Sequence, residues 1–372
     1  MLKLPKFLLM LPVAVLLAGC QYDVLVPTGW VGAQQRDLLL ISVLLMLIVI
    51  IPVMVMVVYF PWKYRATRKD NSDYEPDFSH STKIEVFVWG VPILIILALG
   101  TYTYIYTHRL DPYRPLDHVS FNEEPLQIEA VSLDWKWLFI YPQYGVATVN
   151  EIKMPVGRQV EFRLTSSTVM NTFVVPKLGG MIYSMTGMQT KLHLVADEPG
   201  VFAGRSAHYS GPGFSGMSFN ATALGTPGDE AGNDALFNDW IEEVRAQGTD
   251  LTDEAFLQLE KPSMADPARP SVPMPVTYYR TVSDNLFDRI AGMCVEPGKV
   301  CMSEMMMQDR AGGGGEAGLG DKHRYEYDSE RAVDGFGNAM PPQAAPFAPA
   351  RHGAAGHDHV SAVETEGHTN GQ

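Results

Sequence analysis

Two stretches of the chain contain no charged residue over a length that exceeds the thickness of a membrane core. The first covers residues 38–62 and the second residues 86–107. A helix rises about 1.5 Å per residue, so about 20 residues cross the hydrocarbon layer. Both stretches reach that length, and we expect two transmembrane helices joined by a connector at residues 63–85. The chain is therefore predicted to lie partly in a membrane and partly in water.

The basic residues around the two spans predict their orientation. The connector holds five of them, whereas the segment before the first span, residues 20–37, holds only Arg36. Because cytoplasmic loops are enriched in lysine and arginine, we expect the connector in the cytoplasm and both flanking segments outside it. The long C-terminal part is then periplasmic. The five basic residues are Lys63, Arg65, Arg68, Lys69 and Lys83.

Residues 1–19 have the pattern of a secretory signal peptide. Lys3 and Lys6 precede an apolar run at residues 7–17, and small residues close the segment. The sequence Leu-Ala-Gly-Cys that ends at Cys20 resembles the lipobox of bacterial lipoproteins, whose cysteine is acylated and becomes the mature N-terminus. We therefore expect a lipid anchor on Cys20. The alternative is a free cysteine in a simple membrane anchor.

Charge and cysteine content exclude several classes of protein. The 372 residues include 28 Lys and Arg against 42 Asp and Glu, a formal net charge of −14. Such a surface repels a phosphate backbone, so nucleic acid is not an expected partner. The three cysteines form no C-x-x-C pair, which argues against a zinc ribbon and against a scaffold built from disulfides.

Residues 108–225 show the alternating pattern of β-strands. Val160, Phe162 and Leu164 alternate with charged residues, and Leu192 and Leu194 do the same. Turns rich in glycine and proline separate these runs. Several short strands in about 100 residues are typical of an antiparallel sandwich or a Greek-key barrel, so this region is predicted to be an all-β domain.

The pattern changes after residue 225. Residues 226–307 are predicted to form a helical periplasmic extension, because apolar residues recur at helical spacing in the acidic segment 229–260. Residues 308–372 are rich in Gly, Ala, Pro and His without periodicity, and we predict a disordered tail. The residues at helical spacing are Leu236, Phe237, Trp240, Ile241 and Val244.

Three motifs in the β region resemble those of one family. They are Asp-Trp-Lys-Trp at residues 134–137, Val-Met-Asn-Thr-Phe-Val-Val-Pro at residues 169–176, and the segment at residues 204–217. With the signal and the hairpin, they resemble subunit II of the haem-copper respiratory oxidases over roughly residues 18–290. The resemblance implies a membrane α-helical hairpin followed by a periplasmic all-β, cupredoxin-like sandwich with a small helical C-terminal addition.

In the cytochrome c oxidase branch of this family, the cupredoxin domain holds a two-copper centre with two bridging cysteines, two histidines, a methionine and a glutamate carbonyl. The thiolates are needed because soft ligands suit this copper pair. Here serines replace both cysteines, and neither histidine is present, so no metal is expected in this chain. Phe214 is expected to fill the vacated volume, while the serines and Asn171 hydrogen-bond. The matching positions are Asn171, Ser206, His208, Ser210, Phe214 and Met217.

The copper-free pattern is similar to subunit II of the bo-type quinol oxidases, whose signatures match residues 187–190 and 210–217. This resemblance implies a non-redox subunit of a proton-pumping ubiquinol oxidase in the aerobic respiratory chain, located in the bacterial inner membrane. Haems and one copper would belong to subunit I, where ubiquinol is oxidised and dioxygen is reduced to water. Partners would be subunit I and further small membrane subunits.

A different class of function stays open beside this one. The chain could be a stand-alone membrane lipoprotein that uses a metal-free cupredoxin domain for binding or assembly. The third alternative, a copper-bearing subunit of a cytochrome c oxidase, is disfavoured by Ser206 and Ser210.

We also make predictions for three further residues. Glu85 lies at the predicted cytoplasmic mouth of the second span, where a family glutamate stands at the entry of a proton path. The alternative is an ordinary charge at a helix end. Cys294 and Cys301 lie on the oxidising side of the membrane with six residues between them, so they could form a disulfide or remain two free thiols.

Overall fold

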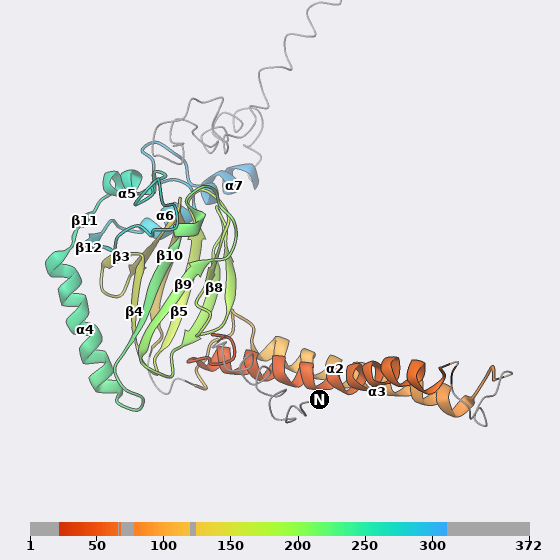
Figure 1. The fold of residues 1–372 in the computed structure, drawn as a ribbon. Helices are drawn as coiled ribbons and strands as arrows, with labels where there is room; N and C mark the ends of the chain where they lie inside the picture. Colours follow the sequence, from red (N-terminus) through yellow and green to blue (C-terminus); the bar gives the residue numbers. More distant parts are fainter. Residues whose placement is uncertain (1–21, 66, 68–77, 120–123, 311–372) are drawn as a thin grey trace, which may run out of the picture.

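The computed structural model describes residues 22–310, apart from residue 66 and residues 68–77 and 120–123. The predicted signal peptide, Cys20 and nearly all of the predicted tail lie outside the described residues. Two helices project from one end of a β domain, and shorter helices lie along one side of that domain and at its other end (Figure 1).

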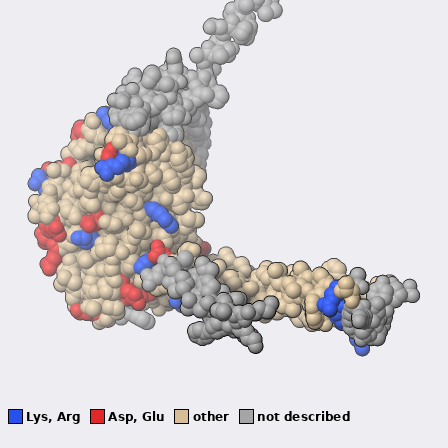
Figure 2. All heavy atoms as spheres, in the orientation of Figure 1, with Lys and Arg blue, Asp and Glu red and all other residues tan. Residues whose placement is uncertain are grey.

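The two projecting helices are α2 (Trp30–Lys63) and α3 (Thr82–Arg109). Both are long and apolar enough to cross a membrane. Each begins before the uncharged stretch predicted as a span, because the polar residues that flank the stretch continue the same helix. Figure 2 shows the hairpin without charged side chains along its middle, with lysine and arginine at its far end.

The β domain consists of two sheets packed face to face. The larger has seven strands in the order β11 (Thr249–Leu251), β12 (Thr277–Val282), β3 (Val146–Val149), β2 (Lys136–Tyr141), β1 (Leu126–Leu133), β5 (Gln159–Ser166) and β8 (Thr190–Val195). The smaller has the order β4 (Glu151–Pro155), β10 (Ser218–Leu224), β9 (Gly200–Ser206), β6 (Asn171–Val174) and β7 (Met181–Ser184). Most neighbours are antiparallel. The parallel pairs are β1 with β5, β4 with β10, and β11 with β12.

Aromatic side chains fill the space between the two sheets. The ring of Phe173 stacks on Phe219 at 5.2 Å and meets the edge of Trp137 at 5.5 Å. Phe139 and Phe162 complete this cluster, and each is completely buried. Large aromatic residues bury much apolar surface, so this layer is the main hydrophobic core of the domain.

A second core covers the outer face of the seven-stranded sheet. Val131 and Leu133 of β1 point into it, opposite the face that carries Leu126 and Ile128. The covering residues come from the C-terminal extension, including Phe256 of α5 (Asp253–Glu260). This explains why every residue of β2 is buried. A strand with one face in water would alternate between buried and exposed residues. The remaining short helix of this layer is α6 (Leu286–Ala291).

The prediction of a helical extension was incomplete. The segment does contain helices, among them α4 (Glu230–Gln247) and α7 (Met302–Arg310). It also supplies β11 and β12, which join the large sheet through the pairing of β12 with β3. Along α4 the predicted apolar face is buried except at Leu236, which is 50% exposed, because the helix turns that side chain away from the sheets.

Backbone contacts fasten the beginning of α2 to the β domain. The N–H of Thr28 donates to the Lys177 carbonyl at 2.9 Å, and the N–H of Gly32 donates to the Leu178 carbonyl at 3.0 Å. Gly179 has φ +82°, and a Cβ there would lie 2.6 Å from the Gly32 Cα. Only glycine tolerates both the positive φ and this approach.

Candidate functional site

The residues predicted to mark the former copper site lie at one end of the sandwich. Asn171 begins β6 and Ser206 ends β9, while Ser210 and Met217 lie on the connection from β9 to β10. That connection contains a short 3₁₀ helix, η1 (Phe214–Gly216). The topology therefore brings Asn171 next to residues that follow it by 35 positions or more, as the motif alignment predicted.

Four buried polar side chains form a continuous hydrogen-bonded series, which we call the polar chain. The Ser206 hydroxyl donates to Asn171 Oδ1 at 2.7 Å, and Asn171 Nδ2 donates to Ser132 Oγ at 3.2 Å. The Ser132 hydroxyl then donates to Ser166 Oγ at 2.9 Å. Asn171, Ser132 and Ser166 are completely buried. A buried polar group is costly unless it is hydrogen-bonded, and the polar chain meets that requirement.

Ser210 and Met217 form a neighbouring contact. The Ser210 hydroxyl lies 3.9 Å from Met217 Sδ, and the Ser210 carbonyl accepts a hydrogen bond from Trp135 Nε1 at 3.1 Å. Trp135 is buried and has φ +67°, an uncommon conformation for a bulky residue. Its ring lies against Gly213, where a Cβ would come within 2.4 Å of the indole. The loop is thus held by packing and hydrogen bonds.

The prediction that Phe214 fills the vacated volume was wrong. Its side chain is only half-buried and meets the ring of Tyr209, which is 71% exposed, at 5.6 Å. His208 is also half-buried, and its ring lies 6.2 Å from the ring of Tyr183. The polar chain occupies the interior instead, because Asn171 and the serines are small enough to pair there.

These residues do not fit a two-copper centre. The centre needs two thiolates and two imidazoles, and the corresponding positions offer hydroxyls, an amide and a phenyl ring. The amide and one hydroxyl are already bonded to each other. Over the described part of the chain, no group of three or more His, Cys, Asp or Glu side chains is arranged to hold a metal ion.

Lys136 has a structural role that the sequence pattern did not indicate. Its ammonium donates to the Lys261 carbonyl at 2.8 Å and to Ser263 Oγ at 2.7 Å, so it ties the extension to the sandwich. Burial lowers the pKa of Lys136 to about 8. Burial also raises the pKa of Asp134, whose carboxyl accepts a hydrogen bond from Thr168 at 2.6 Å. The visible signal was a lysine between two tryptophans, at the point where an apolar strand begins.

Glu85 lies in the first turn of α3, at the end of the hairpin far from the β domain. Its Oε1 is 2.7 Å from His80 Nδ1, and both side chains are more than half exposed. The Thr82 hydroxyl lies 3.3 Å from the other ring nitrogen of His80. The contact between Glu85 and His80 was not predicted from the sequence.

Cys294 and Cys301 are joined by a disulfide in the structure. The bond closes the loop that connects α6 to α7. Cys20 lies outside the described residues.

Comparisons with known proteins agree with this geometry. Residues 142–223 match the family described as cytochrome c oxidase subunit II, periplasmic domain, and residues 245–298 match the COX aromatic rich motif. The first match covers strands β3 to β10, and the second covers most of the extension that forms the second core.

Curated relatives match the chain over most of its length. The chain is 50% identical over 252 residues to the cytochrome bo(3) ubiquinol oxidase subunit 2 of Pseudomonas putida, which covers 68% of this chain and 76% of that protein. It is 43% identical over 309 residues to the ubiquinol oxidase subunit 2 of Acetobacter aceti, covering 80% and 94%. A solved periplasmic domain of cytochrome oxidase subunit II from Bradyrhizobium japonicum is 21% identical, with a TM-score of 0.30, and covers 33% of this chain and 94% of that one.

The hairpin, the two-sheet cupredoxin-like domain and the aromatic-rich extension thus occur together in a chain that matches its relatives over most of their length. This chain belongs to the family of subunit 2 of the bo-type ubiquinol oxidases.

Proposed function

We propose that the chain is the non-redox subunit II of a proton-pumping ubiquinol oxidase in the bacterial inner membrane. Support comes from the names of relatives at 40–50% identity. It also comes from two helices suited to a membrane and from a match to a periplasmic-domain family. In this proposal subunit I carries the haems and the remaining copper, oxidises ubiquinol and reduces dioxygen to water. This chain is the anchor and assembly surface for subunit I.

The polar chain is the observation that carries the non-redox part of the proposal. A soluble one-electron donor needs a metal relay outside the membrane, whereas ubiquinol is dissolved in the bilayer and can deliver electrons there. A domain whose former ligand positions are hydrogen-bonded to each other suits the second case. The loops are then positioned by Asn171 and Ser206 in the way that metal ligands would otherwise position them.

Three residues at the membrane give the subunit further roles in this proposal. Glu85 and His80 together collect protons at the cytoplasmic surface for a path in subunit I, since either group can accept a proton and pass it to the other. Cys20 carries acyl chains that add to the two spans as an anchor. The Glu85→Gln variant of the assembled oxidase should pump protons more slowly, whereas Lys83→Gln, a change of one nearby exposed charge, should not.

The test of the main proposal is purification of the full-length chain with an affinity tag from membranes in mild detergent. A haem protein with many spans should follow the chain in constant proportion, and the complex should oxidise ubiquinol with consumption of dioxygen. Recovery of the chain without a haem protein would contradict the proposal and favour the stand-alone lipoprotein. Oxidation of cytochrome c by the complex would favour the copper-bearing branch.

A second test addresses the former copper site. Copper added to the purified chain should give no purple two-copper spectrum. The variant with Asn171→His, Ser206→Cys, His208→Glu, Ser210→Cys and Phe214→His should give that spectrum, because it restores the full ligand set. A folded variant that binds no copper would contradict the assignment of these positions.

A further inference from the structure

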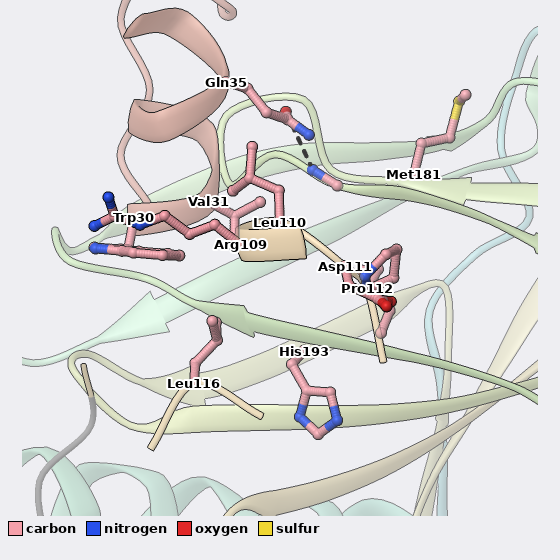
Figure 3. Close-up of a pocket in the computed structure, with 12 residues that line it drawn as sticks. Trp30, Val31, Gln35, Arg109, Leu110, Asp111, Pro112, Leu116, Met181 and His193 are labelled. Carbon is pink, nitrogen blue, oxygen red and sulfur yellow. Dashed lines mark hydrogen bonds between the residues drawn. The ribbon is translucent and has the colours of Figure 1, made fainter. Parts of the chain in front are cut away.

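A small pocket lies where the membrane hairpin meets the β domain (Figure 3). Its volume is about 80 Å³, and its walls come from the beginning of α2, the end of α3 with the segment that follows it, and strands β7 and β8. Trp30, Val31, Leu110 and Leu116 supply apolar wall, while Arg109 and Gln35 supply polar groups. No residue of this pocket belongs to the former copper site.

Two hydrogen-bond donors of this pocket are available to a ligand. The Arg109 guanidinium lies over the Trp30 ring at 5.4 Å, and within the described residues it has no carboxylate partner. The Gln35 side-chain oxygen accepts a hydrogen bond from the Gly180 N–H at 3.4 Å. This contact leaves the NH₂ group of Gln35 free of any partner among the residues that the structure describes. Figure 3 shows the Arg109 guanidinium beside Trp30 and the Gln35 amide on another side of the pocket. A guanidinium without a carboxylate partner favours an anion, and phosphate in particular.

Two other charged side chains near the pocket already have partners. Arg36, on the same helix as Gln35, pairs with Asp37 at 2.8 Å. Asp111 also lines the pocket, and its carboxylate accepts the Tyr113 N–H at 2.9 Å. The negative charge of Asp111 opposes an anion, so its removal should strengthen binding, whereas removal of Arg36 should leave it nearly unchanged.

The position of the pocket identifies the source of the anion. Arg109 is the last residue of α3, and Gln35 lies three residues before the uncharged stretch of α2. The ends of membrane helices lie at the depth of the lipid headgroups, and long arginine side chains at these ends reach that interface. One turn further along α2, Leu39 is 44% exposed and can contact an acyl chain. We infer that the pocket holds the phosphate group of an anionic phospholipid of the periplasmic leaflet.

Native mass spectrometry of the delipidated full-length chain, in its complex if one is recovered, tests this inference. The probe is dilauroyl phosphatidylglycerol. Arg109→Gln should raise the dissociation constant about tenfold, the effect of losing one strong charged contact. Arg109→Lys should restore part of the affinity. Arg36→Gln, the matched loss of one positive charge, should stay within about twofold of the original chain, and Asp111→Asn should bind severalfold more tightly.

Two further probes separate the sources. Glycerol 3-phosphate carries the phosphate without acyl chains, and dilauroylglycerol carries the chains without phosphate. Each should bind at least tenfold more weakly than the phospholipid. Equal binding of glycerol 3-phosphate would overturn the lipid assignment, and equal binding of dilauroylglycerol would overturn the phosphate assignment. Equal affinities of Arg109→Gln and Arg36→Gln would overturn the site itself. If Arg109→Gln does not fold, the test falls on Asp111→Asn. An unchanged affinity of Asp111→Asn for the phospholipid would then overturn the site.

Discussion

Replacement of Asn171 by alanine should destabilise the β domain strongly, although Asn171 is polar. The side chain is completely buried and makes two hydrogen bonds within the polar chain. Alanine removes both bonds, so the Ser206 hydroxyl and the Ser132 oxygen each lose a partner. Ser206 keeps only a 3.4 Å contact with the His208 carbonyl.

The magnitude follows from these contacts. A buried polar group that loses its partner costs about 1–3 kcal/mol. Two groups are affected, and Ser132 keeps its bond to Ser166. We therefore expect Asn171→Ala to lower the free energy of unfolding by about 2–4 kcal/mol. Asn220→Ala, at an exposed position on β10, is the matched control and should change stability by less than about 0.5 kcal/mol.

Urea unfolding of the full chain in detergent, followed by tryptophan fluorescence, measures the effect. A double-mutant cycle with Ser206→Ala isolates the shared bond. In the Asn171→Ala background, Ser206→Ala should cost almost nothing, so the coupling energy between the two positions should be about 1–2 kcal/mol. If the double variant instead loses the sum of the two single-variant losses to within about 0.5 kcal/mol, the polar chain is refuted as the element that positions these loops.

Three further predictions concern the second core and its surroundings. Burial raises the pKa of Glu129 from 4.5 to about 7 in spite of Arg163 at 2.6 Å. The folded chain then keeps a proton that the unfolded chain releases, so stability should fall by about 1–3 kcal/mol between pH 4.5 and 7, and Glu129→Gln should remove that slope in urea unfolding. Phe256→Ala should cost about 3–5 kcal/mol in thermal or urea unfolding, because it opens a cavity in the second core. Cys294→Ser with Cys301→Ser should cost about 2–3 kcal/mol, given the short closed loop, and should speed proteolysis of the extension.

The hairpin and the core between the sheets could be predicted from local sequence patterns, whereas the second core could not. An uncharged run of 25 residues has one structural solution in a membrane, and alternation at Val160 and Phe162 specifies a strand with one buried face. The strand β1 is different. Its outer residues Val131 and Leu133 are covered by side chains such as Phe256, more than 100 positions later. No local period encodes that contact.

The candidate site was likewise predicted only in part. The motif alignment predicted that Asn171 and Ser206 meet, because the family fixes the register of β6 and β9. It gave no indication of Ser132 or Ser166, which join through adjacent parallel strands and are small polar residues without a spacing signal. Phe214 was misplaced because apolar character alone did not show that the loop turns the ring toward Tyr209.

Because the backbones of Gly32 and Gly179 meet closely, we expect the β domain and the beginning of α2 to move together. The 34 residues of α2 give an arm of about 51 Å. A rotation of the domain by about 5° would displace the opposite end of that arm by about 4 Å, a distance comparable to one helical turn. If the domain docks on a partner, as proposed above, its orientation would then affect where Lys63 and the connector lie at the opposite end of the hairpin.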